Sequence, residues 1–193
     1  MSGIRVKTSW FREGEDGHGP EEQASAIAVT IWKLADKAVI NLSNADYDII
    51  TPQRGFTLLA ELIAYMVHMV DRMVHGRIHD EERAELIGAL GVKMAEILED
   101  NIHTVVGDHD HPYVEAILNK FNQRWTDYAG FDFDPENPNF TVKRYLANCI
   151  REVMEARDQS WIADQIIEIE APAFIGPIRK QVEAFYPKHE DRS

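Results

Sequence analysis

One predicted helix, residues 52–75, carries a narrow stripe of side chains that could do chemistry. The stripe consists of Glu61, Tyr65, His68, Arg72 and His75, with Asp71 beside it. Successive members lie four or three positions apart, and this spacing stacks their side chains along one face of a helix. Carboxylate and imidazole groups on one face can bind a metal ion or share a proton. The stripe is therefore the first candidate for a functional site.

A metal site is one interpretation of this stripe. Its ligands, for a divalent metal or iron, would be Glu61, His68, Asp71, His75, Asp100 and His103. Helical bundles that bind two iron ions use Glu-x-x-His on two helices. No histidine of the predicted helices follows a glutamate at that spacing, and the nearest strings are Asp100-x-x-His103 and Asp108-x-x-His111. We favour the other interpretation, in which the stripe is the solvent-exposed edge of an otherwise buried helix with weak surface pairs.

A turn with alternating acids and imidazoles, residues 107–111, is the second candidate. Asp108, His109, Asp110 and His111 could together bind a divalent ion. An Asp just before a helix is also explained as a cap, because its carboxylate accepts hydrogen bonds from free N–H groups of the first turn. We favour capping, and we expect Asp110 or His111 to begin a helix.

Motifs that would indicate an enzyme are absent. The sequence contains no Gly-x-x-x-x-Gly-Lys phosphate loop, no Gly-x-Gly-x-x-Gly, no Gly-x-Ser-x-Gly and no His-Glu-x-x-His. The only cysteine, Cys149, lies in the apolar register of a predicted helix, where we interpret it as a small buried hydrophobic residue. Because no acid, base and nucleophile fall into one pattern, the sequence does not favour catalysis.

Composition and charge restrict the partners. The 193 residues carry a formal net charge of −13, which disfavours binding to nucleic acid or to anionic membranes. Charged side chains interrupt the apolar run Leu58–Val74 and would be costly in lipid, so we do not expect it to span a membrane. No apolar signal core appears at the start, and we expect a cytoplasmic protein.

Helical periodicity extends over most of the chain. It predicts an all-α, single-domain bundle of about six helices in residues 20–187, after a short extended N-terminal arm (1–19) and before a polar tail (188–193). The arm is predicted from the alternation of Ile4, Val6, Thr8 and Trp10. The helices are expected at about 20–42, 52–75, 80–107, 110–130 and 141–157 and from residue 160 onward, with breaks or kinks at Pro172 and Gly176–Pro177.

The helix at residues 52–75 is expected to be the centre of the bundle. Thr51 can cap it, Pro52 suits its first position, and Gly76 suits a left-handed residue after its end. Apolar side chains cover most of its circumference, which is typical of a helix inside a domain or against a partner subunit.

The segment 131–140 is the clearest interruption of the helical pattern. Its prolines, Asp and Asn residues exclude a helix. Phe131, Phe133 and Phe140 are too apolar for a free linker, so we expect this loop to fold back onto the bundle, and long ordered loops are often functional.

These observations lead to two functional hypotheses. The first is a non-catalytic protein that associates through apolar helix faces, either as a homodimer or with another protein, and needs no cofactor. The alternative is a bundle that binds a metal ion or a small ligand at the polar stripe of the central helix.

Overall fold

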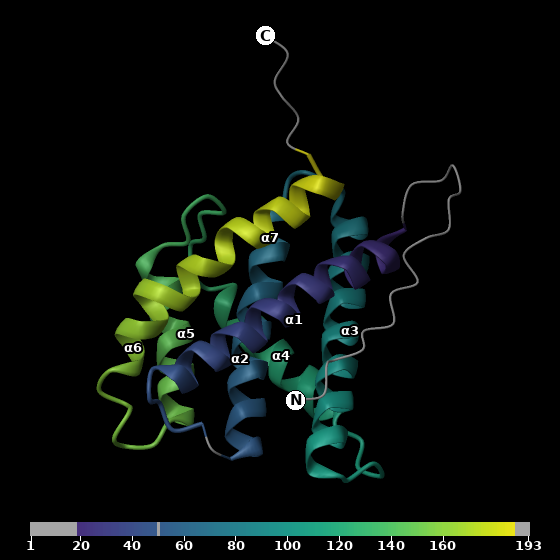
Figure 1. The fold of residues 1–193 in the computed structure, drawn as a ribbon. Helices are drawn as coiled ribbons and strands as arrows, with labels where there is room; N and C mark the ends of the chain where they lie inside the picture. Colours follow the sequence, from purple (N-terminus) through teal and green to yellow (C-terminus); the bar gives the residue numbers. More distant parts are fainter. Residues whose placement is uncertain (1–18, 50, 188–193) are drawn as a thin grey trace.

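The computed structural model describes residues 19–49 and 51–187, and this part of the chain is helical, as predicted (Figure 1). Its elements are α1 (Pro20–Asn44), α2 (Pro52–Val74), α3 (Asp80–Val106), α4 (Val114–Tyr128), α5 (Phe140–Val153), α6 (Ile162–Gln165), the π-helical turn η1 (Ile166–Glu170) and α7 (Ala171–Phe185). The all-α, single-domain prediction is confirmed. The predicted extended arm and the polar tail lie outside the described residues.

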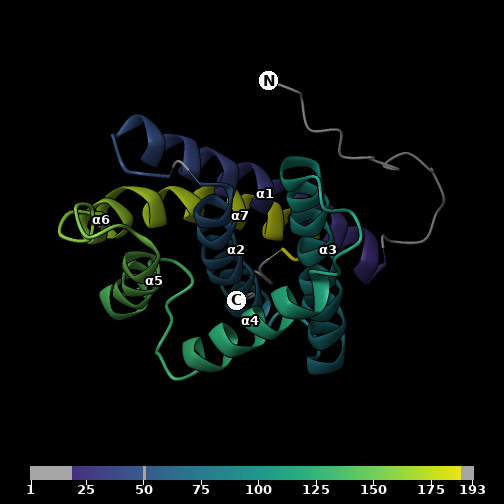
Figure 2. The same ribbon diagram turned by 90° about the horizontal axis from the view of Figure 1, so that it is seen from below.

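Helix α2 occupies the centre of the bundle. Figure 2 shows it surrounded by α1, α3, α4, α5 and α7, and all five pack against it. Every residue from Leu58 to Val70 is buried. The apolar circumference read from the sequence is therefore covered by helices of the same chain.

Local signals set both ends of α2. The Thr51 hydroxyl accepts a hydrogen bond from the Arg54 backbone N–H, and Pro52 occupies the first turn. Gly76, just beyond the end, has a φ of 77°, a conformation that glycine adopts without steric cost. Gly107 ends α3 in the same way. The predicted boundaries are confirmed at these positions.

Helix α4 begins later than we expected, and Asp110 does not cap it. The side chain of Glu99 on α3 caps it instead, accepting hydrogen bonds from the backbone N–H groups of Tyr113 and Val114, the latter at 3.1 Å. In the preceding turn, the Asp108 carboxylate accepts a hydrogen bond from the Asp110 N–H at 3.3 Å. The first-turn N–H groups of α4 are thus satisfied by a residue distant in sequence.

The C-terminal segment does not break at its prolines. Helix α6, η1 and α7 run on without interruption, and the Ala171 N–H donates to the Ile166 carbonyl in the π-helical pattern. Pro172 directly follows the π-helical turn, in the first turn of α7, and Pro177 lies inside α7. The wide π-helical turn lets the helix reach Pro172 without ending.

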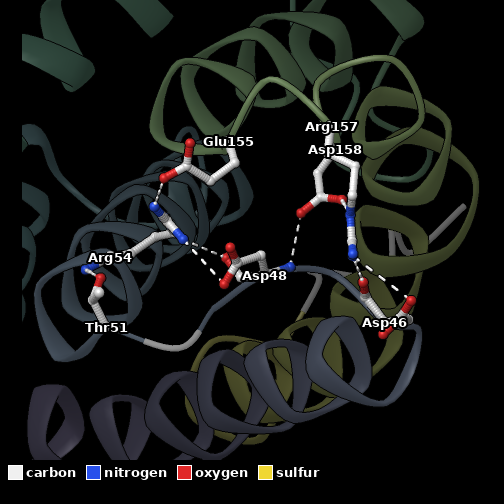
Figure 3. A network of polar contacts seen from close by, with 7 residues as sticks. All are labelled: Asp46, Asp48, Thr51, Arg54, Glu155, Arg157 and Asp158. Atoms are coloured by element: carbon white, nitrogen blue, oxygen red, sulfur yellow. Dashed lines mark hydrogen bonds and ion pairs between the residues drawn. The ribbon is translucent and has the colours of Figure 1, made fainter.

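A polar network joins the α1–α2 loop to the α5–α6 loop (Figure 3). The Asp158 carboxylate accepts hydrogen bonds from the Asp48 backbone N–H at 2.8 Å and from the Arg157 Nε at 2.9 Å. Arg54 of α2 pairs with Asp48 at 3.3 Å and also binds Glu155. Burial raises the pKa of Asp158, but the hydrogen bonds from Asp48 and Arg157 outweigh it and lower that pKa. This network fixes the start of α2 against the end of α5.

The loop between α4 and α5 folds back onto the bundle, as predicted. Phe131 and Phe133 pack against the core, whereas Phe140 is 57% exposed at the start of α5. Asn139 caps α5, because its side chain accepts a hydrogen bond from the Val142 N–H at 3.2 Å. Two of the three phenylalanines therefore hold this loop in place.

Within the described residues, no helix has the length and the continuous apolar stretch that crossing a membrane requires.

Candidate functional site

The polar stripe of α2 faces the interior over most of its length. Glu61, Tyr65 and His68 are 1%, 0% and 6% exposed, whereas His75 is exposed at the helix end. The interpretation of the stripe as a solvent-exposed edge is wrong for the three buried residues, because α4 packs on this side of α2. Buried polar groups must find partners or remain costly, so their contacts show what the site can do.

Glu61 is committed to an ion pair with α4. Its Oε2 accepts from the Arg124 Nε at 2.7 Å, and its Oε1 accepts from the Arg124 NH2 at 2.9 Å and the Lys120 Nζ at 2.8 Å. Burial raises the pKa of Glu61, but the hydrogen bonds from both cations outweigh this effect and lower it. Glu61 in turn raises the pKa of Arg124. Both carboxylate oxygens are occupied, so Glu61 ties α2 to α4.

Three polar atoms near this ion pair lack a hydrogen-bond partner in the described part of the chain. His68 Nε2, the Tyr65 hydroxyl and the Tyr128 hydroxyl are buried and form no hydrogen bond with a described residue. The Tyr128 ring stacks on His68, with centroids 5.1 Å apart, and lies 5.8 Å from the Tyr65 ring. Buried polar atoms without partners are rare in folded proteins, so a group of three marks this region as unusual.

His68 is neutral at physiological pH. Burial, and secondarily the charge of Arg72, lower the pKa of its imidazole to about 4. The imidazole ring stacks on Tyr128 and makes an edge-to-face contact with Phe133, with ring centroids 5.3 Å apart. A neutral imidazole has one nitrogen that donates and one that accepts, so the buried Nε2 can take either role, depending on the tautomer.

A cavity of about 730 Å³ lies next to His68, between α2, α3, α4 and the loop 129–139. Apolar and aromatic side chains form much of its wall, including Ile87, Trp125, Phe131 and Phe133. The Trp125 ring is fixed, because its Nε1 donates to the Ala64 carbonyl of α2 at 3.1 Å. The wall contains apolar and polar residues in about equal numbers, and the volume falls within the range of small-ligand sites.

Charged side chains from two elements complete the cavity wall. Asp71 and Arg72 come from α2, and Asp132 and Asp134 from the loop. The Asp71 carboxylate pairs with the Arg83 Nε of α3 at 3.3 Å. Charged side chains therefore share the wall with the aromatic rings and with the neutral imidazole of His68.

The proposed metal ligands do not converge. His68 and Asp71 line the same cavity, but Glu61 is engaged by Arg124 and Lys120. His75 and Asp100 are exposed, and the ring of His103 contacts the His111 carbonyl at 2.8 Å. Across residues 19–49 and 51–187, no three His, Cys, Asp or Glu side chains form a group that could hold a metal ion.

Cys149 is buried, as the sequence indicated. Its side chain is 5% exposed, and burial together with the charge of Glu61 raises the pKa of its thiol to about 11. The thiol is therefore protonated at neutral pH and a poor nucleophile.

Sequence reasoning missed the α4 residues of this site. Lys120 and Arg124 lie one helical turn apart, beside the apolar face formed by Phe121, Trp125 and Tyr128. Two cations on the flank of an apolar face are a detectable signal for a buried carboxylate elsewhere in the chain. The position of the cavity had no comparable signal, because it depends on how the loop 129–139 lies over α2.

No protein-family model, curated protein or solved structure matches this chain. The function is therefore argued from the geometry of the site.

Proposed function

We propose that this protein is a non-catalytic helical bundle that binds a small ligand in the cavity beside His68. One observation carries the proposal: a cavity of about 730 Å³ has in its wall a 6% exposed imidazole whose Nε2 has no partner among the described residues. A ligand group that pairs with this nitrogen would satisfy a polar atom that otherwise costs free energy.

Binding is better supported than catalysis. The side chains that line the cavity include an imidazole and carboxylates, but no serine, threonine, cysteine or lysine. The pKa of His68, at about 4, is also far from the value that suits a general base at neutral pH.

The prediction of self-association depended on the apolar circumference of α2. Other helices of the same chain cover this surface, so it does not support an interface with a partner. Among residues 19–49 and 51–187, the exposed large apolar side chains belong to several different elements: Ile40, Val92, Val105, Val106, Phe140, Trp161 and Ile169. Isolated exposed apolar residues are normal on a protein surface.

A fragment screen by NMR on the ¹⁵N-labelled chain would test the proposal. We expect hits that shift the amide signals of His68, Trp125 and Phe133. Ala129 lines the cavity and is exposed, so Ala129→Trp should fill the space and abolish these shifts. Ala116→Trp, also at an exposed position of α4 but away from the cavity, is the matched control. A screen without such hits, or hits that persist in Ala129→Trp, would overturn the proposal.

A further inference from the structure

The charge of the cavity wall is predominantly negative. Asp71, Asp132 and Asp134 contribute three carboxylates, and Arg72 contributes one guanidinium. Arg83 neutralises Asp71 from α3, which leaves Asp132 and Asp134 as the carboxylates at the loop side. Both loop residues are exposed, and the chain as a whole has a formal net charge of −13. The resulting potential attracts cations toward the cavity.

The loop that carries these carboxylates is anchored at several points. The Asn139 side chain donates to the Asp132 carbonyl, and the Asp134 carboxylate accepts from the Glu136 N–H at 2.8 Å. From α7, Arg179 donates to the Pro135 carbonyl at 3.3 Å and to the Glu136 carbonyl at 2.7 Å. The loop backbone and the Asp134 carboxylate are therefore positioned before any ligand binds, which reduces the ordering cost of binding.

Aromatic rings line the same cavity. Trp125, Phe131 and Phe133 come from α4 and the loop, and their π faces attract positive charge. His68 does not oppose a cation, because its imidazole is neutral. Its Nε2 has no hydrogen-bond partner among the described residues but is shielded from solvent, so a ligand N–H would reach it only if the ring or its neighbours shift.

We propose that the ligand is an organic cation: a substituted ammonium group with at least one N–H, carried on an apolar or aromatic body. The body packs against Trp125, Phe131 and Phe133, and the ammonium group pairs with Asp132 or Asp134. This inference rests on the proposed function, since it names the chemical class that the cavity takes.

The main alternative to a cationic ligand is an anionic ligand that pairs with Arg72. Arg72 lies in the wall without an ion pair to a described residue, and an anionic ligand would use it as its main contact. The cation proposal assigns it the opposite effect: its charge repels the ligand, so removing it should leave binding unchanged or strengthen it.

Three probes with the same body and different charge separate these cases. They are phenethylammonium, 2-phenylethanol and 3-phenylpropanoate, titrated into the full chain at pH 7 and followed by NMR shifts of the cavity amides. We expect phenethylammonium to bind about tenfold more tightly than the alcohol, and 3-phenylpropanoate to bind most weakly. Asp132→Asn combined with Asp134→Asn should remove the preference for the cation. Asp100→Asn, at an exposed carboxylate of α3, should not.

Arg72→Gln decides between the two charges. Unchanged or tighter binding of phenethylammonium in this variant supports the proposal. Tighter binding of 3-phenylpropanoate to the native chain, lost in Arg72→Gln, overturns the cation inference and leaves the ligand-binding function intact. Equal affinity for all three probes, or no binding of any probe when other fragments occupy the cavity, also overturns the inference alone. An absence of any cavity ligand removes both proposals.

Discussion

Gly91 of α3 and Trp125 of α4 are packed so closely that no side chain fits between them. A Cβ atom added at Gly91 would lie 2.7 Å from Cη2 of the Trp125 ring. On its other side, the same ring is hydrogen-bonded to the Ala64 carbonyl of α2 at 3.1 Å. The indole is thus held between two helices, and because Trp125 lines the cavity, this contact also shapes the ligand site.

Gly91→Ala is expected to destabilise the protein, although alanine is the better helix former. Alanine would gain about 1 kcal/mol in helix propensity. Overpacking against the fixed indole should cost about 1–3 kcal/mol and move Trp125. Urea unfolding would give the change in free energy, and the Trp125 indole N–H signal would report the displacement of the ring.

Gly88→Ala is the matched control in the same helix. Nothing lies within 4 Å of a Cβ at Gly88, which is exposed. This substitution should stabilise the protein by about 0.5–1 kcal/mol. If both variants changed stability by the same amount and in the same direction, the Gly91–Trp125 contact would not be as tight as the structure shows.

Glu61→Gln is expected to be strongly destabilising. The substitution leaves Arg124 and Lys120 without their carboxylate in a largely buried position. Removing one partner of a buried ion pair typically costs about 3–5 kcal/mol, because the other charge stays desolvated. Chemical denaturation of the variant against the native chain measures this loss.

A double-mutant cycle would identify the source of that cost. Arg124→Gln alone should also destabilise, whereas Glu61→Gln together with Arg124→Gln should lose less than the sum of the two single changes. Strict additivity would show that the two side chains do not interact in solution.

His68 should make the protein sensitive to mild acid. Its pKa is about 4 in the folded protein and 6.5 in the unfolded chain, so between these values only the unfolded chain binds the proton. Stability therefore falls as the pH decreases from about 6.5 to about 4, by about 3 kcal/mol at most, and is unaffected by this group above pH 6.5. Urea unfolding at a series of pH values measures the trend.

The variant His68→Phe isolates this contribution. Phenylalanine retains a ring against Tyr128 but does not titrate, so the free energy of unfolding of the native chain should fall relative to that of the variant as the pH falls from 6.5 to 4. A difference that stays constant over this window would mean that His68 does not carry a lowered pKa.

The fold was predictable because its signals are local. Thr51, Pro52 and Gly76 mark the ends of α2 within a few residues of the boundary, and the apolar periodicity of α2 gave its central place. Where a partner distant in sequence decides the outcome, the prediction was wrong. The start of α4 depends on Glu99, 15 residues before Val114, and no capping rule within the helix could have found it.

The candidate site was predictable only in part. The spacing of Glu61 and His68 placed them on one face of a helix, but periodicity alone does not say whether solvent or another helix meets that face. Whether this face is buried depends on α4, because the ion pair with Arg124 offsets the free-energy cost of burying Glu61. The prolines of segment 131–140 predict the loop that carries Asp132 and Asp134. They do not predict the path of this loop over α2, which brings the two residues to the cavity.

Asp158→Ala should loosen the junction between the α1–α2 and α5–α6 loops. Asp158 is 5% exposed, and its carboxylate accepts a hydrogen bond from the Asp48 backbone N–H at 2.8 Å (Figure 3). The substitution removes this acceptor from the Asp48 N–H. Loss of a buried hydrogen-bond acceptor typically costs about 1–3 kcal/mol. Because the pKa of Asp158 is lowered on folding, its contribution is present above its ordinary value of 3.8 and is lost as the pH falls through the lower folded value.

Glu155→Ala serves as the comparison for Asp158→Ala. Glu155 belongs to the same network, but it is exposed and its side chain pairs with Arg54, so loss of this side chain should cost less than about 0.5 kcal/mol. Amide hydrogen exchange at Asp48 distinguishes the two: it should accelerate in Asp158→Ala and remain slow in Glu155→Ala. Equal acceleration in both variants would show that the network acts through its overall charge, and that the buried carboxylate has no special part in joining the loops.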